Sequence, residues 1–506
     1  MRNTQNKSTI HESTTPNTDW DNINWYKVEK HVDKLQKRIY DAESKGDSRK
    51  VRDTQRILIY SKSALLLAVK RVTQTNKGRR TPGIDKFRAL SSKQRGELVD
   101  KLLSRNIALH KPKPAYRKYI KKKNGKLRAL GIPTIIDRVY QEIIRMALEP
   151  QAEVNFEATS YGFRPKRGPH DAIERIFNNM SRGKWCWIYE ADLRACFDNL
   201  SHDFILELTK GFPLQKLIKR FLEAGYVDNN VFHITDKGTP QGGLLSPLLA
   251  NIALTGLEKC LNITYKQTFR KRGDKTYEIY ETKGNYRVVR YADDFVIFAA
   301  TKEDIEKVHQ LIQPYLDDRG LELAEEKTNI VHATEGFDFL GFNCRLYPQQ
   351  NGKMKCFIKP SKSSIKSFKE KANAIFKRLQ GHSVDELIKA LNPLLIGTAH
   401  YWRTSVAKRI LGSMDSYIWL KTRKFIKKLH PKKRWKWIKN KYYPLYDDGH
   451  HRNNWILTGP KEKNHLFRMD WLPIKRWIMI KNNFSPYDRT KTVYFLNRES
   501  KTFKFR

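Results

Sequence analysis

Apolar residues recur with two different periods along this chain, and the change of period marks its parts. From about residue 25 to residue 74 they recur every three or four positions with charged residues between them, which predicts amphipathic helices. Residues 134–150 follow the same helical pattern. Residues 116–132 instead form two β-like flanks around Asn124-Gly125, a dipeptide typical of a two-residue turn. This part of the chain is therefore expected to be helical with one β-hairpin.

The middle of the chain mixes the two periods. Short apolar stretches typical of strands alternate with helical segments between residues 185 and 345, a pattern that predicts an α+β fold. The chain has 506 residues, which is too long for one ordinary core. We expect about two to four domains. With 39% hydrophobic residues, the chain has enough apolar side chains to build those cores.

Two adjacent acids interrupt the apolar run VVRYADDFVIFAA at residues 288–300. The pattern predicts a hairpin with its turn at Ala292-Asp293-Asp294. Taken alone, a solvated turn explains both acids, because Asp side chains hydrogen-bond to the backbone of turns. Asp192 follows another apolar stretch, and if the two strands are neighbours the carboxylates converge and repel one another. A divalent cation that prefers hard oxygen ligands, such as Mg²⁺, would remove that repulsion.

The charge of the chain points to a polyanionic partner. Lys and Arg number 98 against 53 Asp and Glu, which gives a net charge of +45. Nucleic acid is the simplest such partner, and an anionic membrane surface is the second. The chain has no apolar run of about 18 residues, so no membrane span is expected. A basic protein with a shared acidic cluster fits phosphoryl transfer on nucleic acid.

Residues 401–506 concentrate both positive charge and tryptophan. They hold 27 Lys and Arg against 7 Asp and Glu, and seven of the eleven Trp residues. Basic residues interleaved with large aromatic side chains suit phosphate contact and base stacking. The alternative for each single Trp is a place in a small hydrophobic core, and for the charges a solvated face. For the segment as a whole, the sequence favours nucleic-acid binding.

Cysteine use and the N-terminus bear on the compartment. The five Cys residues are scattered and include no CxxC pair, so neither a disulfide framework nor a zinc module is expected. The N-terminus lacks the apolar core of a secretion signal and has too few Arg residues for a mitochondrial presequence. We expect an intracellular location, in a bacterial cytoplasm or in an organelle that encodes the gene.

Several motifs carry a resemblance to a known family. YADD at residues 291–294 resembles the YxDD box of reverse transcriptases, and Asp192 resembles their first catalytic aspartate. GTPQGGLLSPLLANI at residues 238–252 resembles the substrate-positioning loop and helix of group II intron-encoded reverse transcriptases, often called maturases. On an ordered set of matches from about residue 60 to 500, the chain is identified as a member of that family. The further matches are RRTPGIDK (79–86), KKKNGKLRALGIPTIIDR (121–138), SYGFRPKRGPHDA (160–172), EKT (326–328), FLGF (339–342), LNPLLIGTAHYWR (391–403), HP (430–431) and SPYD (485–488).

The resemblance implies a right-hand polymerase of the α+β class. Its expected parts are fingers, a palm whose antiparallel sheet carries the catalytic carboxylates, a helical thumb or maturase X domain, and a basic C-terminal DNA-binding region. They would cover residues 61–180, 181–345, 346–445 and 446–506, after an N-terminal extension at residues 1–60. Many family members end in an HNH endonuclease with paired CxxC cysteines. No such cysteines follow SPYD here, so we expect no HNH domain and no second-strand DNA cleavage by this chain.

The resemblance also implies a metal site. In the family, the first aspartate of each acidic box binds two Mg²⁺ ions. This role carries over to Asp192 and Asp293, with the Leu193 carbonyl as a further ligand, and Asp294 carries over as the third catalytic acid. Two such ions would activate an attacking 3′-hydroxyl and stabilise the leaving pyrophosphate.

Further residues would surround the incoming dNTP. Lys122 and Arg128 of the expected fingers hairpin would meet the triphosphate, one as a point charge and the other as a planar fork. The alternative for both is a solvated basic hairpin. Phe197 stands where the family places an aromatic ring that crowds the nucleotide 2′ position and selects deoxynucleotides. Its alternative is ordinary core packing.

The remaining assignments concern the base pair, the leaving group and the nucleic acid. Gln241 and Gly242 would abut the nascent base pair, where a side chain on Gly242 would obstruct close approach. Lys327 would donate a proton to the leaving pyrophosphate. The alternative interpretation of Lys327 is a solvated surface lysine without this role. Basic and aromatic residues in three of the matched segments would bind nucleic acid. These are Arg164, Lys166, Arg167, Tyr401, Trp402, Arg403, Lys432, Lys433 and Arg434.

The expected function is that of an RNA-directed DNA polymerase that also assists splicing of its host intron. Its partners would be group II intron RNA, an RNA template with a DNA primer, target DNA and dNTPs, with no membrane. One alternative is a splicing-only maturase that binds RNA and no longer polymerises. Another is a reverse transcriptase adapted to a CRISPR or other defence system. The sequence leaves the host intron, the DNA target site, fidelity, processivity and oligomeric state open.

Overall fold

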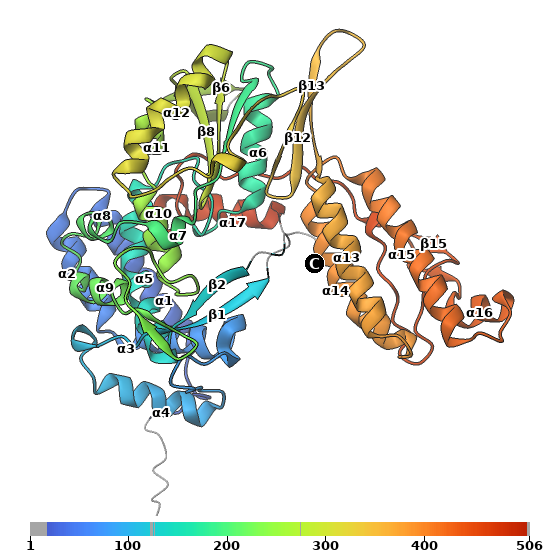
Figure 1. The fold of residues 1–506 in the computed structure, drawn as a ribbon, viewed down its shortest axis with the longest axis horizontal. Helices are drawn as coiled ribbons and strands as arrows, with labels where there is room; N and C mark the ends of the chain where they lie inside the picture. Colours follow the sequence, from blue (N-terminus) through green and yellow to red (C-terminus); the bar gives the residue numbers. More distant parts are fainter. Residues whose placement is uncertain (1–17, 122–124, 126, 274, 503–506) are drawn as a thin grey trace, which may run out of the picture.

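The computed structural model describes residues 18–121, 125, 127–273 and 275–502 and shows a large body with a helical arm at its side (Figure 1). Two hydrophobic cores hold it together. The first joins the N-terminal helices to one face of the central sheet, and the second joins the other face of that sheet to the arm. Within the described ranges, no helix is long and apolar enough to cross a membrane.

The N-terminal helices pack around one long, largely buried helix. The first three all contact α5, and side chains of Asn24, Asp47 and Ser61 cap their N-termini. The helical patterns predicted for residues 25–74 and 134–150 are therefore confirmed. The residues expected to form an N-terminal extension are integrated with the fingers. The helices of this group are α1 (Trp25–Glu43), α2 (Ser48–Ile59), α3 (Lys62–Lys70), α4 (Ser92–Leu103) and α5 (Ile135–Asn155).

A four-stranded sheet in the order β2-β1-β4-β5 combines two strands from the range predicted as fingers with two from the range predicted as palm. β1 (Ala115–Lys121) and β2 (Leu127–Ile132) form the predicted antiparallel hairpin. Its ladder ends with Lys121 paired with Leu127. The turn predicted at Asn124-Gly125 lies between these ends, where Asn124 is outside the described residues. The other two strands are β4 (Tyr226–Asp228) and β5 (Val231–His233).

The palm is an antiparallel sheet in the order β10-β3-β9-β8, covered on both faces. Successive residues alternate between the two cores: Tyr189 faces the first core with α12, and Ile188 faces the second with α6. The strands are β3 (Trp187–Ala191), β8 (Tyr286–Tyr291), β9 (Asp294–Ala299) and β10 (Asn329–His332). The covering helices are α6 (Pro169–Met180) and α12 (Lys302–Asp317).

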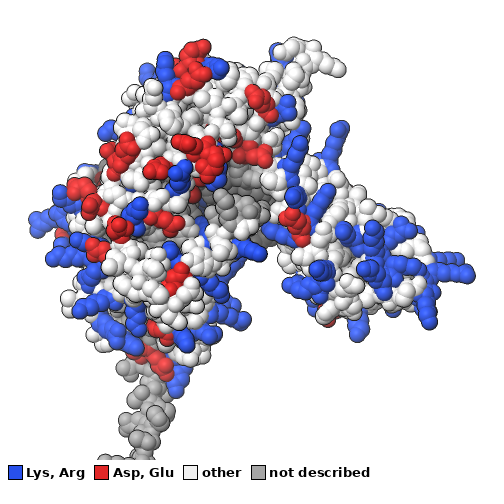
Figure 2. All heavy atoms as spheres, viewed as in Figure 1, with Lys and Arg blue, Asp and Glu red and all other residues white. Residues whose placement is uncertain are grey.

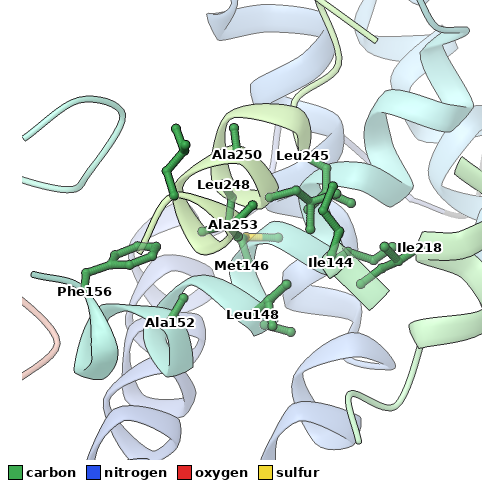
Figure 3. Packing of buried hydrophobic residues seen from close by; sticks show 14 of the residues in the cluster. Ile144, Met146, Leu148, Ala152, Phe156, Ile218, Leu245, Leu248, Ala250 and Ala253 are labelled. Carbon is green, nitrogen blue, oxygen red and sulfur yellow. The ribbon is translucent and has the colours of Figure 1, made fainter. Parts of the chain in front are cut away.

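Short helices join the palm to the fingers. Figure 3 shows Met146 and Leu148 of α5 packed beside Leu248 and Ala253 of α10, all buried. This contact fixes the loop before α10 against the long fingers helix. The connecting elements are α7 (Cys196–Asn199), α8 (His202–Leu208), α9 (Gln215–Leu222), α10 (Ser246–Ala253), α11 (Leu257–Cys260) and the hairpin of β6 (Thr264–Arg272) and β7 (Lys275–Lys283).

A three-stranded sheet leads from the palm to the arm. Its strands are β11 (Phe337–Phe339), β12 (Phe342–Pro348) and β13 (Met354–Pro360). The arm follows as α13 (Lys362–Arg378), α14 (Val384–Trp402), α15 (Lys408–Leu429) and α16 (Trp435–Tyr442), with a small ladder of β14 (Tyr446–Asp447) and β15 (Arg452–Asn453). These four helices lie within residues 346–445, the range predicted for the thumb.

The last residues return from the arm to the body. Residues 474–502, here called the C-terminal strap, run back to α6 and end in α17 (Thr492–Thr502), which lies near the lower end of α6 in Figure 1. Arg476 pairs with Glu174 of α6 at 2.6 Å. The region expected at 446–506 therefore divides between the arm and the body.

Candidate active site

Two neighbouring palm strands bring the acidic residues together. β3 and β9 are paired with Ala191 opposite Phe295, so Asp192 and Asp294 stand at facing ends of adjacent strands. The two strands are therefore neighbours, which is the condition for their carboxylates to converge. β8 and β9 pair Tyr291 with Asp294, so the turn contains only Ala292 and Asp293, with Ala292 at φ 58°. The prediction that Asp294 belongs to the turn is wrong, because Asp294 is the first residue of β9.

The carboxylates repel one another. Burial raises the pKa of Asp293, and repulsion from Asp192 adds to that rise. Asp294 is exposed at the start of β9, and desolvation by its surroundings together with repulsion from Asp293 and Asp192 raises its pKa to about 7. Such a cluster favours a bound cation.

A lysine already supplies one positive charge. The Lys327 ammonium donates a hydrogen bond to Asp192 Oδ2, and this bond raises the pKa of Lys327. Backbone contacts hold the segment that carries Lys327 beside the end of β3. Ala324 N donates to the Asp192 carbonyl at 2.8 Å, and Leu193 forms an antiparallel β-bridge with Leu323. A cation therefore fits beside Asp192.

The donor set fits a hard divalent ion. In the described part of the chain, no group of three or more His, Cys, Asp or Glu side chains has the spacing of a complete metal site. Mg²⁺ does not require one, since it binds through one or two carboxylates and takes its other ligands from water and substrate phosphates. Asp192 and Asp293 match that requirement.

The fingers hairpin docks onto the loop before α10. Arg128 Nε donates to Gln241 Oε1 at 2.8 Å, and Gly131 N donates to the Gln241 carbonyl at 2.8 Å. Gly242 has φ 124°, and a Cβ there would lie 2.6 Å from the Gly131 carbonyl oxygen. Arg128 also opposes the rise in the pKa of Asp293, so its charge reaches the acidic cluster. The structure thus brings three of the predicted dNTP residues together, while Lys122 lies outside the described residues.

Phe197 is joined to the same loop through its backbone. It belongs to α7, is 8% exposed, and its carbonyl accepts a hydrogen bond from Thr239 N at 2.6 Å. α7 begins four residues after Asp192. The ring is thus held close to both the strand end and the loop that carries Gln241.

A buried network that the sequence did not reveal supports the acidic turn. Arg290 is 2% exposed, and its Nη1 donates to the Ala292 carbonyl at 3.2 Å and to Asn251 Oδ1 at 3.1 Å. Asn251 Nδ2 donates to the Gly162 carbonyl at 2.8 Å. A Cβ on Gly162 would lie 2.4 Å from Ala292 N. The sequence signal for this network is Arg290 itself, a charge inside an apolar strand.

Two of the arginines expected to bind nucleic acid are buried inside the protein. Arg164 Nε pairs with Glu153 at 2.8 Å, and both side chains are fully buried. Arg167 Nη2 donates to the Asn482 carbonyl at 2.7 Å in the C-terminal strap. Both guanidinium groups serve the protein interior, so direct nucleic-acid contact is not retained for them. Lys166 between them is exposed and pairs with Glu499.

The six arm residues predicted to bind nucleic acid also divide into residues packed inside the protein and residues exposed on its surface. Trp402 and Arg403 are buried, and Tyr401 stacks on Phe342 with ring centroids 5.1 Å apart. The Tyr401 hydroxyl also donates to the Leu340 carbonyl at 2.9 Å, whereas Trp402 packs on Phe368 of α13 inside the arm. Direct nucleic-acid contact is therefore not retained for the buried Trp402 and Arg403. Lys432, Lys433 and Arg434 are exposed in the loop before α16 and remain accessible to a partner. Figure 2 shows Lys and Arg side chains crowded over the arm.

Comparison with known proteins supports the same interpretation. Residues 120–344 match the model of the reverse transcriptase (RNA-dependent DNA polymerase) family, and residues 20–102 match the N-terminal domain of reverse transcriptase. Residues 365–443 match the group II intron maturase-specific domain. All three matches lie in the order expected from the motifs.

Curated relatives extend the comparison. Protein YkfC of Escherichia coli (strain K12) is 34% identical over 57% of this chain and 82% of its own length. The group II intron-encoded protein LtrA of Lactococcus lactis subsp. cremoris is 33% identical over 54% of this chain and 53% of its own length, so this chain spans about half of it. The putative COX1/OXI3 intron 1 protein of Saccharomyces cerevisiae is 30% identical over 56% of this chain and 38% of its own length. Together with the geometry of the palm, these matches show that the chain belongs to the group II intron-encoded reverse transcriptases and maturases.

Proposed function

We propose that this protein copies RNA into DNA and assists the splicing of a group II intron. The proposal rests on one observation. Asp192, Asp293 and Asp294 meet where β3 ends and β9 begins, and Arg128, which influences Asp293, binds Gln241 of the loop before α10. Reverse transcriptase domains generally use divalent metal ions, and group II maturases bind intron RNA. A splicing-only protein has no need of this carboxylate cluster.

The residues of the site suit nucleotidyl transfer. Asp192 and Asp293, with the Leu193 carbonyl, would hold two Mg²⁺ ions, whose chemistry is to activate a primer 3′-hydroxyl and neutralise phosphate charge. Arg128 would bind the triphosphate of a dNTP through its planar guanidinium. Lys327 would leave Asp192 and protonate the departing pyrophosphate.

The nucleic acid would lie between the body and the arm. Lys432, Lys433 and Arg434 would contact its phosphates, and the basic C-terminal residues would contact target DNA. The exposed Lys166 would extend this surface onto the body once it leaves Glu499. The net charge of +45 supports a polyanion of this size.

The direct test is cDNA synthesis by the full chain on an RNA template with a DNA primer, Mg²⁺ and dNTPs. We expect extension products that depend on both the template and the metal. Wild-type protein that extends no primer on any RNA template would contradict the polymerase assignment. RNA binding without extension would instead support the splicing-only alternative.

Substitution of Phe197 by Val should relax the choice of sugar. Shortening the ring opens space at the nucleotide 2′ position, and we expect the preference for dNTPs over rNTPs to fall by about 10- to 100-fold. The measurement is kcat/KM for a matched dNTP and rNTP. If Phe197 only fills the core, both values will fall together and their ratio will stay constant.

Substitution of Gly162 by Ala should displace the acidic turn. The added methyl would sit 2.4 Å from Ala292 N, so the turn must shift. A displacement of this kind costs about 100-fold in kcat. Gly397 in α14 is the control, because a Cβ there meets no atom within 4 Å and Ala should stabilise the helix by about 0.5–1 kcal/mol. Equal cDNA synthesis by both variants would show that the turn tolerates the shift.

A further inference from the structure

The hairpin of β12 and β13 has two chemically different faces. Figure 1 shows it projecting beyond the palm, between α6 and α13. The face toward α6 is buried and apolar, and its members belong to the second core: Phe342, Cys344, Leu346, Cys356 and Ile358. The residues between them point the other way, as strand geometry requires. This outer face is not apolar.

The outer face alternates cations with aromatic rings. Three cross-strand pairs form it in succession: Asn343 with Lys359, Arg345 with Phe357, and Tyr347 with Lys355. Arg345 and Lys355 are exposed, and the rings of Tyr347 and Phe357 are partly exposed. A solvent-facing sheet surface is usually polar, so two partly exposed aromatic rings on this face need a further explanation.

The rings and cations on this face contact one another closely. The centroids of Tyr347 and Phe357 are 5.5 Å apart. The Lys359 ammonium lies 4.5 Å from the Tyr347 centroid and 5.5 Å from that of Phe357. Arg345 lies 5.1 Å from the Tyr347 ring and Lys355 lies 5.3 Å from the Phe357 ring. Three positive charges thus surround one aromatic pair.

No ion pair within the described ranges joins Arg345, Lys355 or Lys359 to a carboxylate, and the acid on the same face of β11, Asp338, accepts from Asn343 Nδ2 at 2.8 Å. Like charges on one sheet face repel, so the face is complementary to an anion that runs along the hairpin.

We propose that the outer face of the β12–β13 hairpin binds an unpaired segment of RNA. Lys355, Arg345 and Lys359 would contact successive phosphates, and a base would stack on Tyr347 or Phe357. A regular RNA duplex keeps its bases stacked inside, whereas loops and bulges offer free ring faces. The hairpin also leads directly into α13 and the maturase-specific domain at residues 365–443, which places this face next to the part of the chain that binds intron RNA. The proposal thus deepens the proposed maturase function.

The test is RNA binding with the polymerase site already filled. The probe is a labelled stem–loop RNA with a uridine loop, titrated against the full chain that is saturated with an unlabelled primer–template. The charge variant is Arg345→Gln, Lys355→Gln and Lys359→Gln combined. We expect a loss of affinity of at least about 10-fold and a salt slope lower by about two, since each phosphate contact on a single strand contributes about 0.7.

A second variant separates stacking from charge. Tyr347→Leu combined with Phe357→Leu keeps an apolar cover and all three cations, so it should lose about 10-fold in affinity without a change in salt slope. The matched charge control is Lys45→Gln, Arg49→Gln and Lys50→Gln, three exposed residues in the loop after α1 and the first turn of α2. It should bind the probe as wild type does.

The outcomes are distinct from those that test polymerisation. Probe binding by the charge variant equal to that of the control overturns the proposal. Loss of oligonucleotide-primed extension by the hairpin variants also overturns it, because the face would then serve the primer–template. If wild-type protein binds the stem–loop through this face but synthesises no cDNA, the polymerase assignment fails and the RNA-binding face stands.

Discussion

Substitution of Asp293 by Asn should lower cDNA synthesis by at least about 1,000-fold, since it removes a charged ligand from the reacting centre. The same change should leave the fold intact. Burial and repulsion from Asp192 raise the pKa of Asp293, so its charge opposes folding when no metal is bound. We therefore expect the melting temperature of the metal-free variant to equal or exceed that of wild type. Primer extension and thermal unfolding with and without MgCl₂ measure the two effects.

The control for Asp293 is Asp203→Asn, which removes the same charge from an exposed palm residue in the first turn of α8. It should retain wild-type synthesis. A second readout is the shift in melting temperature on adding Mg²⁺ and a dNTP, which should be present in wild type and reduced in Asp293→Asn. Synthesis by Asp293→Asn above a tenth of the wild-type rate would exclude its carboxylate from the reaction.

The fold was largely predictable because local pattern and ordered motifs agree. The helices around α5 and the β1–β2 hairpin follow directly from apolar periodicity. The extent of the turn at residues 292–294 was not predictable, because the β8–β9 pairing draws Asp294 into the strand and local turn preference does not decide that register.

The site was predictable only where the chain carries an unusual local signal. Acids at the ends of apolar strands, such as Asp192 and Asp293, are costly without a function, so they stand out. Arg290 also stands out because it interrupts an apolar strand, but a basic residue in a polar segment gives no such signal in a chain of net charge +45. Arg164 and Arg167 resemble any surface arginine in sequence, and their partners become visible only in three dimensions. The partner of Arg167 lies more than 300 residues away in the C-terminal strap.

The strap leads to the second large expected effect, at Asp171 of α6. This carboxylate is 1% exposed and accepts three hydrogen bonds from the strap: from Arg498 at 2.7 Å, Ile480 N at 2.8 Å and Trp477 Nε1 at 3.0 Å. Asp171→Ala would leave a buried guanidinium without its carboxylate. We expect a loss of about 3–5 kcal/mol in the stability of the strap against the palm. Urea unfolding and limited proteolysis of residues 474–502 measure that loss.

The matched control is Glu499→Gln, which breaks the pair of Glu499 with the exposed Lys166 at the same interface. An exposed pair contributes at most about 1 kcal/mol, so this variant should resist protease nearly as well as wild type. Because the strap ties the arm back to the palm, its release in Asp171→Ala should also shorten cDNA products while the first nucleotide is still added. Wild-type protease resistance in Asp171→Ala would show that the strap is held mainly by its apolar contacts, among them Phe484 and Ile480 in the second core.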